Sequence, residues 1–432
     1  MKILLSLALA MIMFASPATA QSSDPLDAIA RDYVRAMLEI GERDDGFVDA
    51  YYGPAEWREA ARANPRSLEE LGRAVEVLQQ RLAAISVVAD SPEARRVAFL
   101  NAQLTAASNR LRLVRGERLT FAEEAQGIYG VSLDGLLFPL EHYDPILARI
   151  ERLVPGEGPL ADRVDAFLDR FVVPRERLDA VMRAATAECR RRTVAHFPLP
   201  DSEAFTLEFV TNKPWSGYNW YQGNYRSVIQ INTDQPVRLG RAVDLGCHEG
   251  YPGHHVYNML LEQGLARGRD WLEYTVYPLY SPQSFIAEGS ANYGIQLAFP
   301  GAERLTFETR VLYPLAGLPT AQAAAYIALQ EATRELGGAR FTIARDLIEG
   351  RITRDQAIAL TQRYQLVSAA RAAQSIDFTQ HYRAYVINYG LGEEMVGAWI
   401  ERQGDTQEAR WAAMRRLLSE PTLPVDLLPR AR

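Results

Sequence analysis

One short segment of this chain gathers residue types that could bind a metal ion. Residues 248–255 have the sequence HEGYPGHH, and they include three of the six histidines of the chain beside a glutamate. Neutral imidazole and carboxylate groups are ligands for zinc, and zinc peptidases place their general base directly after the first histidine ligand. The segment therefore indicates a metal site with His248 as a ligand and Glu249 as the base.

The spacing of these histidines differs from that of the common H-E-x-x-H helix, because Pro252 stands where the second histidine would be. In an unbroken helix, residues six apart differ by about 240° around the axis and by about 9 Å along it. His248 and His254 could not share an ion in that geometry. Proline interrupts helical hydrogen bonding, and glycine relaxes the restriction on φ. We therefore predict that Pro252 and Gly253 deform the helix and return His254 to the ion, with His255 as the alternative ligand.

A hydrolytic zinc site needs a third protein ligand and an open coordination position. The best downstream candidate is Glu288, which lies in a segment of helical character with small residues around it. Small side chains would allow this helix to approach the histidine helix closely. Asp244 lies four residues before His248 and is a candidate acceptor for the other ring N–H of that histidine, although aspartates near helix starts are common caps.

These residues resemble a known family, the bacterial domain-of-unknown-function family 885, whose members look like predominantly helical relatives of zinc metallopeptidases. The resemblance rests on H-E-x-x-P-G-H-H at residues 248–255, on a downstream glutamate–glycine pair at 288–289, and on the sequence YGLGE at 389–393. Three positions depart from the family pattern, namely Ser290, Asn292 and Glu393. The resemblance implies the following site residues: zinc ligands His248, His254 and Glu288, general base Glu249, and Tyr389 as a catalytic hydroxyl donor to the developing oxyanion.

The elements that must position these residues are mostly helical. Apolar residues recur at helical spacing over residues 27–43, and capping boxes begin helices at Ser67 and Thr353. From about residue 205 to 233, alternating apolar and aromatic residues with interrupting glycines predict a small strand-and-hairpin element. We therefore predict a mainly α, large helical, metallopeptidase-like fold with this β element beside the active-site helix. The β element could bind an extended peptide or could simply cover the core.

The chain shows no internal repeat and no low-complexity linker. We predict one helical domain over residues 21–432. The sequence PGEGP at 155–159 could separate an N-terminal helical half, residues 21–155, from a half that carries the metal site, residues 160–432.

The first 20 residues have the features of a secretory signal peptide. An apolar run over residues 3–14 is followed by the small-residue pattern ATA at 18–20. The run is too short for a permanent anchor, and no comparable run recurs. We therefore expect an exported, periplasmic protein with no integral membrane segment in the mature chain.

Charge and cysteine content limit the function classes further. A formal net charge of −7 without basic blocks argues against nucleic acid as a partner. The two cysteines, Cys189 and Cys247, could pair in an exported protein, but their separation does not follow from the sequence. Cys247 could be a soft metal ligand, yet a small buried residue on a helix face is the better interpretation.

The leading interpretation is an exported zinc-dependent peptidase that uses a zinc-activated water and Glu249 as base to hydrolyse peptide bonds. The alternative is a non-catalytic peptide-binding or metal-binding protein on a metallopeptidase scaffold. Glu249 favours catalysis, because a purely structural site has no use for a base. A serine or cysteine hydrolase is disfavoured, because the chain has no G-x-S-x-G sequence.

Overall fold

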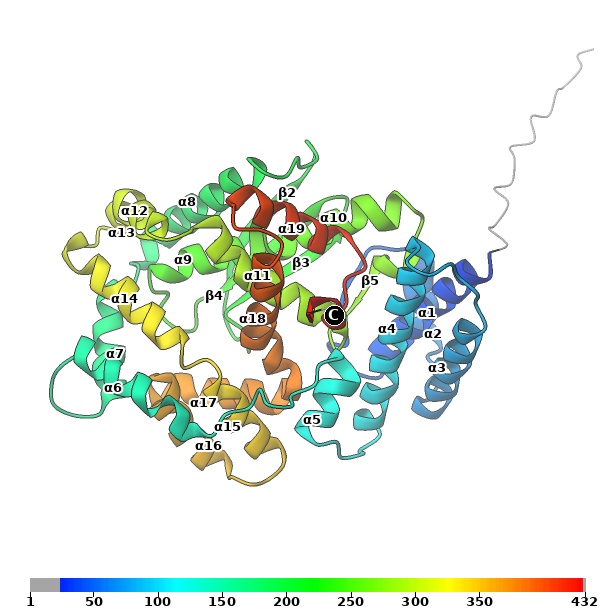
Figure 1. Cartoon of the computed structure of the whole chain (residues 1–432), viewed down its shortest axis with the longest axis horizontal. Coiled ribbons are helices and arrows are strands. Elements are labelled where there is room, and N and C mark those ends of the chain that lie inside the picture. Colours follow the sequence, from blue (N-terminus) through cyan, green and yellow to red (C-terminus); the bar gives the residue numbers. More distant parts are fainter. Residues whose placement is uncertain (1–23, 430–432) are drawn as a thin grey trace, which may run out of the picture.

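The computed structural model describes residues 24–429 and is mainly α-helical, which confirms the predicted fold class (Figure 1). The signal peptide expected over residues 1–20 lies outside the described residues. None of the helices within residues 24–429 combines the length and the apolar character needed to cross a bilayer.

The helices fall into three successive groups along the chain. The first group is α1 (Pro25–Gly41), α2 (Ala55–Ala63), α3 (Leu68–Ala83), α4 (Pro92–Val114) and α5 (Phe121–Glu124). The second is α6 (Asp144–Leu153), α7 (Leu160–Leu168) and α8 (Arg175–Val194). The third is α9 (Gly240–Leu245), α10 (His254–Leu261), α11 (Pro282–Ala298), α12 (Glu303–Phe307), α13 (Tyr313–Ala316), α14 (Ala323–Arg334), α15 (Ala339–Ile348), α16 (Arg354–Gln365), α17 (Ala369–Tyr382), α18 (Ile387–Glu401) and α19 (Gln407–Ser419).

Local sequence signals determine where several of these helices begin. At the start of α3, the Ser67 hydroxyl accepts a hydrogen bond from the Glu70 backbone N–H, and the Glu70 carboxylate accepts one from the Ser67 N–H. The start of α16 has the same reciprocal arrangement with Thr353. Each capping box satisfies backbone donors that have no partner within the helix. Both predicted capping boxes are therefore confirmed.

The predicted β element is present as a three-stranded sheet. It contains β2 (Ala204–Val210), β3 (Gly217–Gly223) and β4 (Arg226–Asn232) in the order β2-β4-β3. β2 runs parallel to β4, whereas β3 and β4 form an antiparallel hairpin, so β3 is an edge strand. A second, two-stranded sheet was not predicted; in it, β1 (Val48–Tyr51) pairs with β5 (Val276–Pro278). Strands of three and four residues are too short to show an alternating pattern.

The arrangement of the helices places α11 and α18 at the centre of the molecule. Figure 1 shows α1–α4 at one end and α6, α7 and α14 at the other, with α11 and α18 side by side between them. The main apolar core contains residues from both sides of the 155–159 segment, for example Leu104 of α4 and Phe285 of α11. α11 is buried along most of its length, so the residues on it have fixed surroundings.

Two glycines determine how closely α11 is packed. A Cβ added to Gly289 would lie 2.5 Å from the carbonyl carbon of Gly392 in α18, so only glycine permits this approach of two backbones. A Cβ on Gly294 would lie 2.8 Å from Cγ of Pro252. The small residues around Glu288 therefore allow two different close contacts of α11. Gly294 serves the expected contact with the histidine segment, and Gly289 serves the contact with α18.

Candidate metal centre

The helix that carries His248 is interrupted at the predicted place. α9 continues into a π-helical turn, η4 (Gly246–Gly250), and α10 begins anew at His254. The N–H of Gly253 donates to the carbonyl of Cys247 at 3.0 Å, which folds the connection back onto η4. A Cβ on Gly253 would lie 1.8 Å from the His248 carbonyl oxygen. Only glycine fits here, and the tight return brings the His254 ring to within 3.1 Å of His248, measured between their Nε2 atoms.

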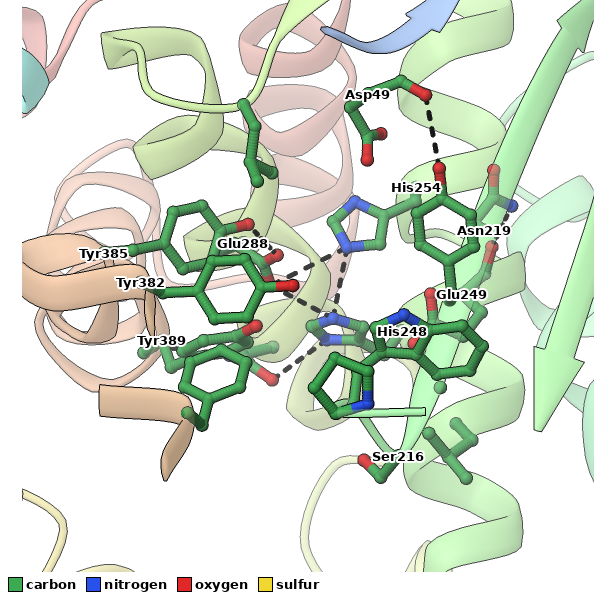
Figure 2. A pocket seen from close by; sticks show the side chains of 18 of the residues that line it. Asp49, Ser216, Asn219, His248, Glu249, His254, Glu288, Tyr382, Tyr385 and Tyr389 are labelled. Carbon is green, nitrogen blue, oxygen red and sulfur yellow. Dashed lines mark hydrogen bonds and ion pairs between the residues drawn. The ribbon is translucent and has the colours of Figure 1, made fainter. Parts of the chain in front are cut away.

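Three ligand-type atoms from two segments meet at this point, as Figure 2 shows. Glu288 Oε2 lies 3.1 Å from His248 Nε2 and 3.7 Å from His254 Nε2. Four ligands placed tetrahedrally at about 2.0–2.1 Å from a zinc ion are about 3.3–3.4 Å apart. The separations in the cluster therefore fit one ion held by all three side chains.

The hydrogen bonding of Glu288 supports the same fit. Its Oε2 atom is buried and accepts no aligned hydrogen bond from any residue in the described part of the chain. Its other oxygen, Oε1, accepts a hydrogen bond of 2.7 Å from the Tyr385 hydroxyl, which fixes the orientation of the carboxylate. A buried carboxylate oxygen without a donor is costly, and a cation bound between the histidines would satisfy it.

The charges in the cluster favour binding of a cation. Burial by itself would raise the pKa of Glu288, but the two histidines outweigh it and hold that pKa well below its usual range. For His254, burial would lower the pKa, and the carboxylate of Glu288 outweighs this and raises it. The carboxylate thus stays ionised beside the two imidazoles, so it attracts either a proton or a metal ion to the same place.

Asn292 fixes the orientation of the His248 ring. Its Oδ1 lies 3.0 Å from His248 Nδ1, while its Nδ2 donates to the Tyr389 carbonyl at 3.3 Å. Oδ1 must therefore be the acceptor, so Nδ1 of His248 carries the proton and Nε2 presents its lone pair to the cluster. The expected partner, Asp244, instead forms an ion pair with Arg304 at 2.9 Å. That expectation was wrong, because a neighbouring arginine engages the carboxylate.

Glu249 is buried next to His248, with 4% of its surface exposed. Strand β3 positions it: Asn219 donates to the Glu249 carbonyl at 2.7 Å. A Cβ on Gly217 would lie 2.6 Å from Glu249 Oε1, so the strand packs directly on the carboxylate. Burial raises the pKa of Glu249, and the charge of the neighbouring His248 opposes the rise. A carboxyl group with a raised pKa can accept and return a proton more readily near neutral pH.

A cavity of about 660 Å³ opens in front of the cluster and is lined by all three candidate ligands and Glu249. Tyr389 lies on its wall, with its ring stacked near His248 at 6.5 Å between centroids. Figure 2 shows the Tyr382 hydroxyl directed toward the space between the two histidines. Burial raises the pKa of Asp49, which lies on β1 at the same cavity, to about 7.

Several of these residues were missed by reasoning from the sequence. Asn292 was noted only as a departure from the family pattern, and Asp49 gave no signal because its strand is short. The tyrosines, by contrast, have a recognisable pattern in the sequence. Tyr382, Tyr385 and Tyr389 are spaced by three and four residues, which is the spacing of one helical face. A polar aromatic stripe of this kind, so close to Tyr389, could have been included in the candidate site.

His255 lies apart from the cluster. Its Nδ1 is 2.8 Å from Ser227 Oγ and its Nε2 is 3.0 Å from Glu203 Oε2, so both ring nitrogens are engaged. The alternative in which His255 replaces His254 as ligand is therefore not supported by the geometry. Serine, histidine and carboxylate also occur together in hydrolases, but these three side chains are buried and none lines the cavity at the cluster. They anchor α10 to the sheet.

Cys189 and Cys247 form a disulfide with 5.3 Å between their Cα atoms. The bond joins α8 to η4 one residue before His248. Cys247 is therefore neither a free thiol nor a metal ligand, and the disulfide fixes the position of the histidine segment.

Comparison with known proteins gives the fold and no activity. No family model matches the sequence, and no curated protein matches it. A solved structure from Colwellia psychrerythraea, described as a "putative lipoprotein", has a TM-score of 0.50 and 16% identity over 91% of this chain and 75% of its own. A second, from Shewanella oneidensis and described as a "putative lipoprotein of unknown function", has a TM-score of 0.46 and 12% identity over 92% and 83%. At such identities, the likeness to the first structure concerns the fold alone.

Proposed function

We propose that this protein is a zinc-dependent peptidase and that His248, His254 and Glu288 are its zinc ligands. One observation carries the proposal: three ligand atoms 3.1–3.7 Å apart lie next to the buried carboxylate of Glu249 on the wall of one cavity. A structural zinc site is usually closed by four protein ligands, whereas a catalytic site keeps one position open. The same residues support the proposal that the chain belongs to the domain-of-unknown-function family 885.

Zinc bound at this cluster would supply an acidified water and a polarised substrate carbonyl. Glu249 would accept the proton that the attacking water loses, and it would then donate that proton to the leaving amine. As the carbonyl oxygen gains negative charge, a hydroxyl group already in place would stabilise it. Tyr382 and Tyr389 are both candidates, because both line the cavity and the hydroxyl of Tyr385 already donates to Glu288.

The edge strand β3 supports a peptide as substrate. Gly217, Tyr218 and Asn219 of this strand line the cavity beside the cluster. An edge strand has unpaired backbone groups, to which an extended peptide can add as a further strand. The Tyr218 hydroxyl donates to the carbonyl of Asp49 at 3.2 Å, so β1 and β3 form one wall.

We also propose that the protein is exported, to the periplasm in a bacterial cell. The expected signal peptide supports this location, and so does the disulfide between Cys189 and Cys247, because such bonds persist in oxidising compartments. The solved protein of Colwellia psychrerythraea is described as a "putative lipoprotein", a description that fits an exported protein.

Metal analysis combined with cleavage of a mixed peptide library tests the proposed function. The wild type, purified without chelator, should contain about one zinc per chain and cleave peptides. Glu249→Gln should keep the zinc and lose activity by about 10²–10⁴-fold, because proton transfer has lost its base. His248→Ala should lose the zinc. His142→Ala provides the matched control, since that histidine is exposed and lies outside the cavity.

Two results would contradict the proposal: wild-type protein that contains no metal, and zinc affinity that is unchanged in His248→Ala. A third result would favour the non-catalytic alternative. In that case the wild type would hold zinc and bind peptides without cleaving them, and Glu249→Gln would behave like the wild type.

A further inference from the structure

Three arginines line the cavity without a carboxylate partner. Arg334 ends α14, Arg340 lies in the first turn of α15, and Arg371 lies in the first turn of α17. Within residues 24–429, no aspartate or glutamate oxygen lies within ion-pairing distance of any of the three. Three separate helices therefore direct unpaired positive charge to one cavity.

Arg340 is the most constrained of the three. Its Nε atom is buried and has no hydrogen-bond acceptor among the described residues. Its guanidinium carbon lies 5.3 Å from the ring centroid of Phe378 and 5.7 Å from that of Tyr389. The two aromatic rings hold the guanidinium in place without neutralising it. Burial lowers the pKa of Arg340, as expected for a cation that has lost water and gained no anion.

Arg371 is partly buried at the same cavity. One of its Nη atoms donates to the Pro236 carbonyl at 3.2 Å, and a neutral carbonyl does not balance the charge. Burial lowers the pKa of Arg371, and repulsion from Arg238 and Arg241 adds to the effect, while the charges of Asp165 and Asp169 oppose it. Burying an uncompensated charge is costly, so proteins seldom do it unless a bound anion completes the site.

The carboxylates that share this part of the cavity are already engaged. Asp244 pairs with Arg304 at 2.9 Å and with Arg241 at 3.4 Å. Glu393 accepts a hydrogen bond from Gln296, and its charge interacts with that of Arg334. Arg340 is thus left without a compensating carboxylate and Arg371 without an ion pair among the described residues, and an anion that enters the cavity would meet both.

Arg340 lies within reach of a peptide at the candidate metal centre. The Arg340 guanidinium carbon is 5.7 Å from the Tyr389 ring centroid, which is 6.5 Å from the His248 ring centroid. By way of Tyr389, the distance from guanidinium to histidine ring is thus at most about 12 Å, the length of about three or four residues of extended chain.

We propose that Arg340, assisted by Arg371, binds a carboxylate of the substrate, so that the protein acts near the free C-terminus of a peptide. The inference rests on the proposed peptidase function and names the substrate class of that site. Guanidinium and carboxylate groups form paired, charge-assisted hydrogen bonds, and the planar fork of arginine fits both oxygens. An acidic side chain near the cleaved bond offers the same chemistry, and the test separates the two sources.

The test uses acetylated tetrapeptides of alanine and phenylalanine in two forms, with a free C-terminal carboxylate and with a C-terminal amide. The free acid should be cleaved with a kcat/KM roughly 10- to 100-fold above that of the amide, mainly through KM, because a charge-assisted bond is lost in the amide. Arg340→Met should remove this difference, and Arg340→Lys should restore part of it. Arg371→Met should reduce the difference between acid and amide, and it provides the test if Arg340→Met does not fold.

A matched control and a third peptide complete the design. Arg183→Met should retain the preference for the free acid. Arg183 is exposed, forms an ion pair of 2.9 Å with Asp179, and does not line the cavity. The third peptide is amidated and has one glutamate in place of alanine. If it is cleaved as well as the free acid and depends on Arg340, the carboxylate site stands but its ligand is a side chain, which overturns the proposed action at the C-terminus.

A binding arm distinguishes failure of this inference from failure of the proposed function. Calorimetry with Glu249→Gln protein measures the affinity for the free acid and for the amide without cleavage. If the wild type cleaves no peptide but the free acid binds in an Arg340-dependent way, the peptidase function is wrong and the carboxylate site stands. If peptides are cleaved and Arg340→Met affects acid and amide equally, the carboxylate inference is wrong and the peptidase function stands.

Discussion

Replacement of Gly253 by alanine tests the backbone geometry on which the candidate metal centre depends. The added Cβ would lie 1.8 Å from the His248 carbonyl oxygen and 2.5 Å from that of Cys247. Cβ atoms do not approach other heavy atoms below 3.0 Å, so one of the two backbones must move. The clash is with main-chain atoms, and no change of side-chain rotamer can relieve it. The His248 and His254 segments must therefore separate by about 1 Å or more.

The expected losses of stability and of zinc affinity in Gly253→Ala can be estimated from the size of this displacement. Overpacking of this kind costs about 1–3 kcal/mol of folding free energy, and contact between backbones places Gly253→Ala at the upper end. Distances from metal to ligand tolerate deviations of only about 0.2 Å, so a displacement of about 1 Å should lower zinc affinity by at least about 100-fold.

Zinc competition titration and urea denaturation of the same preparations measure both effects. Gly264→Ala is the matched control, because the nearest atom to its added Cβ is 4.0 Å away and the residue lies in a helical segment. Alanine there should leave zinc affinity unchanged and raise stability by about 0.5–1 kcal/mol. A Gly253→Ala protein that keeps the wild-type denaturation midpoint and binds zinc within twofold of the wild type would contradict this prediction.

Two further predictions concern stability. The hydrogen bonds from His255, Tyr251 and Arg190 outweigh burial and lower the pKa of Glu203 from 4.5 to about 2. Ionised Glu203 should therefore stabilise the fold above about pH 5, and this stabilisation should be lost as the pH falls toward 2. Glu203→Gln should remove up to about 3 kcal/mol of the decrease in the free energy of unfolding over this pH range, as measured by denaturation at each pH. The same pH dependence in the variant and the wild type would contradict this. The Cys189–Cys247 bond joins residues 58 apart, so the double alanine variant should be less stable by up to about 4 kcal/mol in urea denaturation, and a change below about 1 kcal/mol would contradict that.

Features that depend on neighbouring residues were well predicted from the sequence. The capping boxes at Ser67 and Thr353 and the β element near residues 205–233 all appear as expected, because such signals act over a few residues. The break at Pro252 and Gly253 followed from helix geometry, from the expectation that His248 and His254 share one ion, and from the effects of proline and glycine on the backbone. The pairing of β1 with β5, and the place it gives to Asp49, could not follow, since the two strands are far apart in the chain and very short.

The sequence by itself determined which residue types could form the candidate centre: two histidines in a segment that cannot remain one helix, a glutamate beside the first, and a second glutamate on a later helix. Only the tertiary structure decided how these residues are supported. It directed His254 rather than His255 to Glu288, it placed Asn292 instead of Asp244 against His248, and it brought Arg340 to the same cavity from another helix. The physical reason is that local sequence determines where the backbone turns, whereas the direction and partners of a side chain depend on which distant elements pack against it.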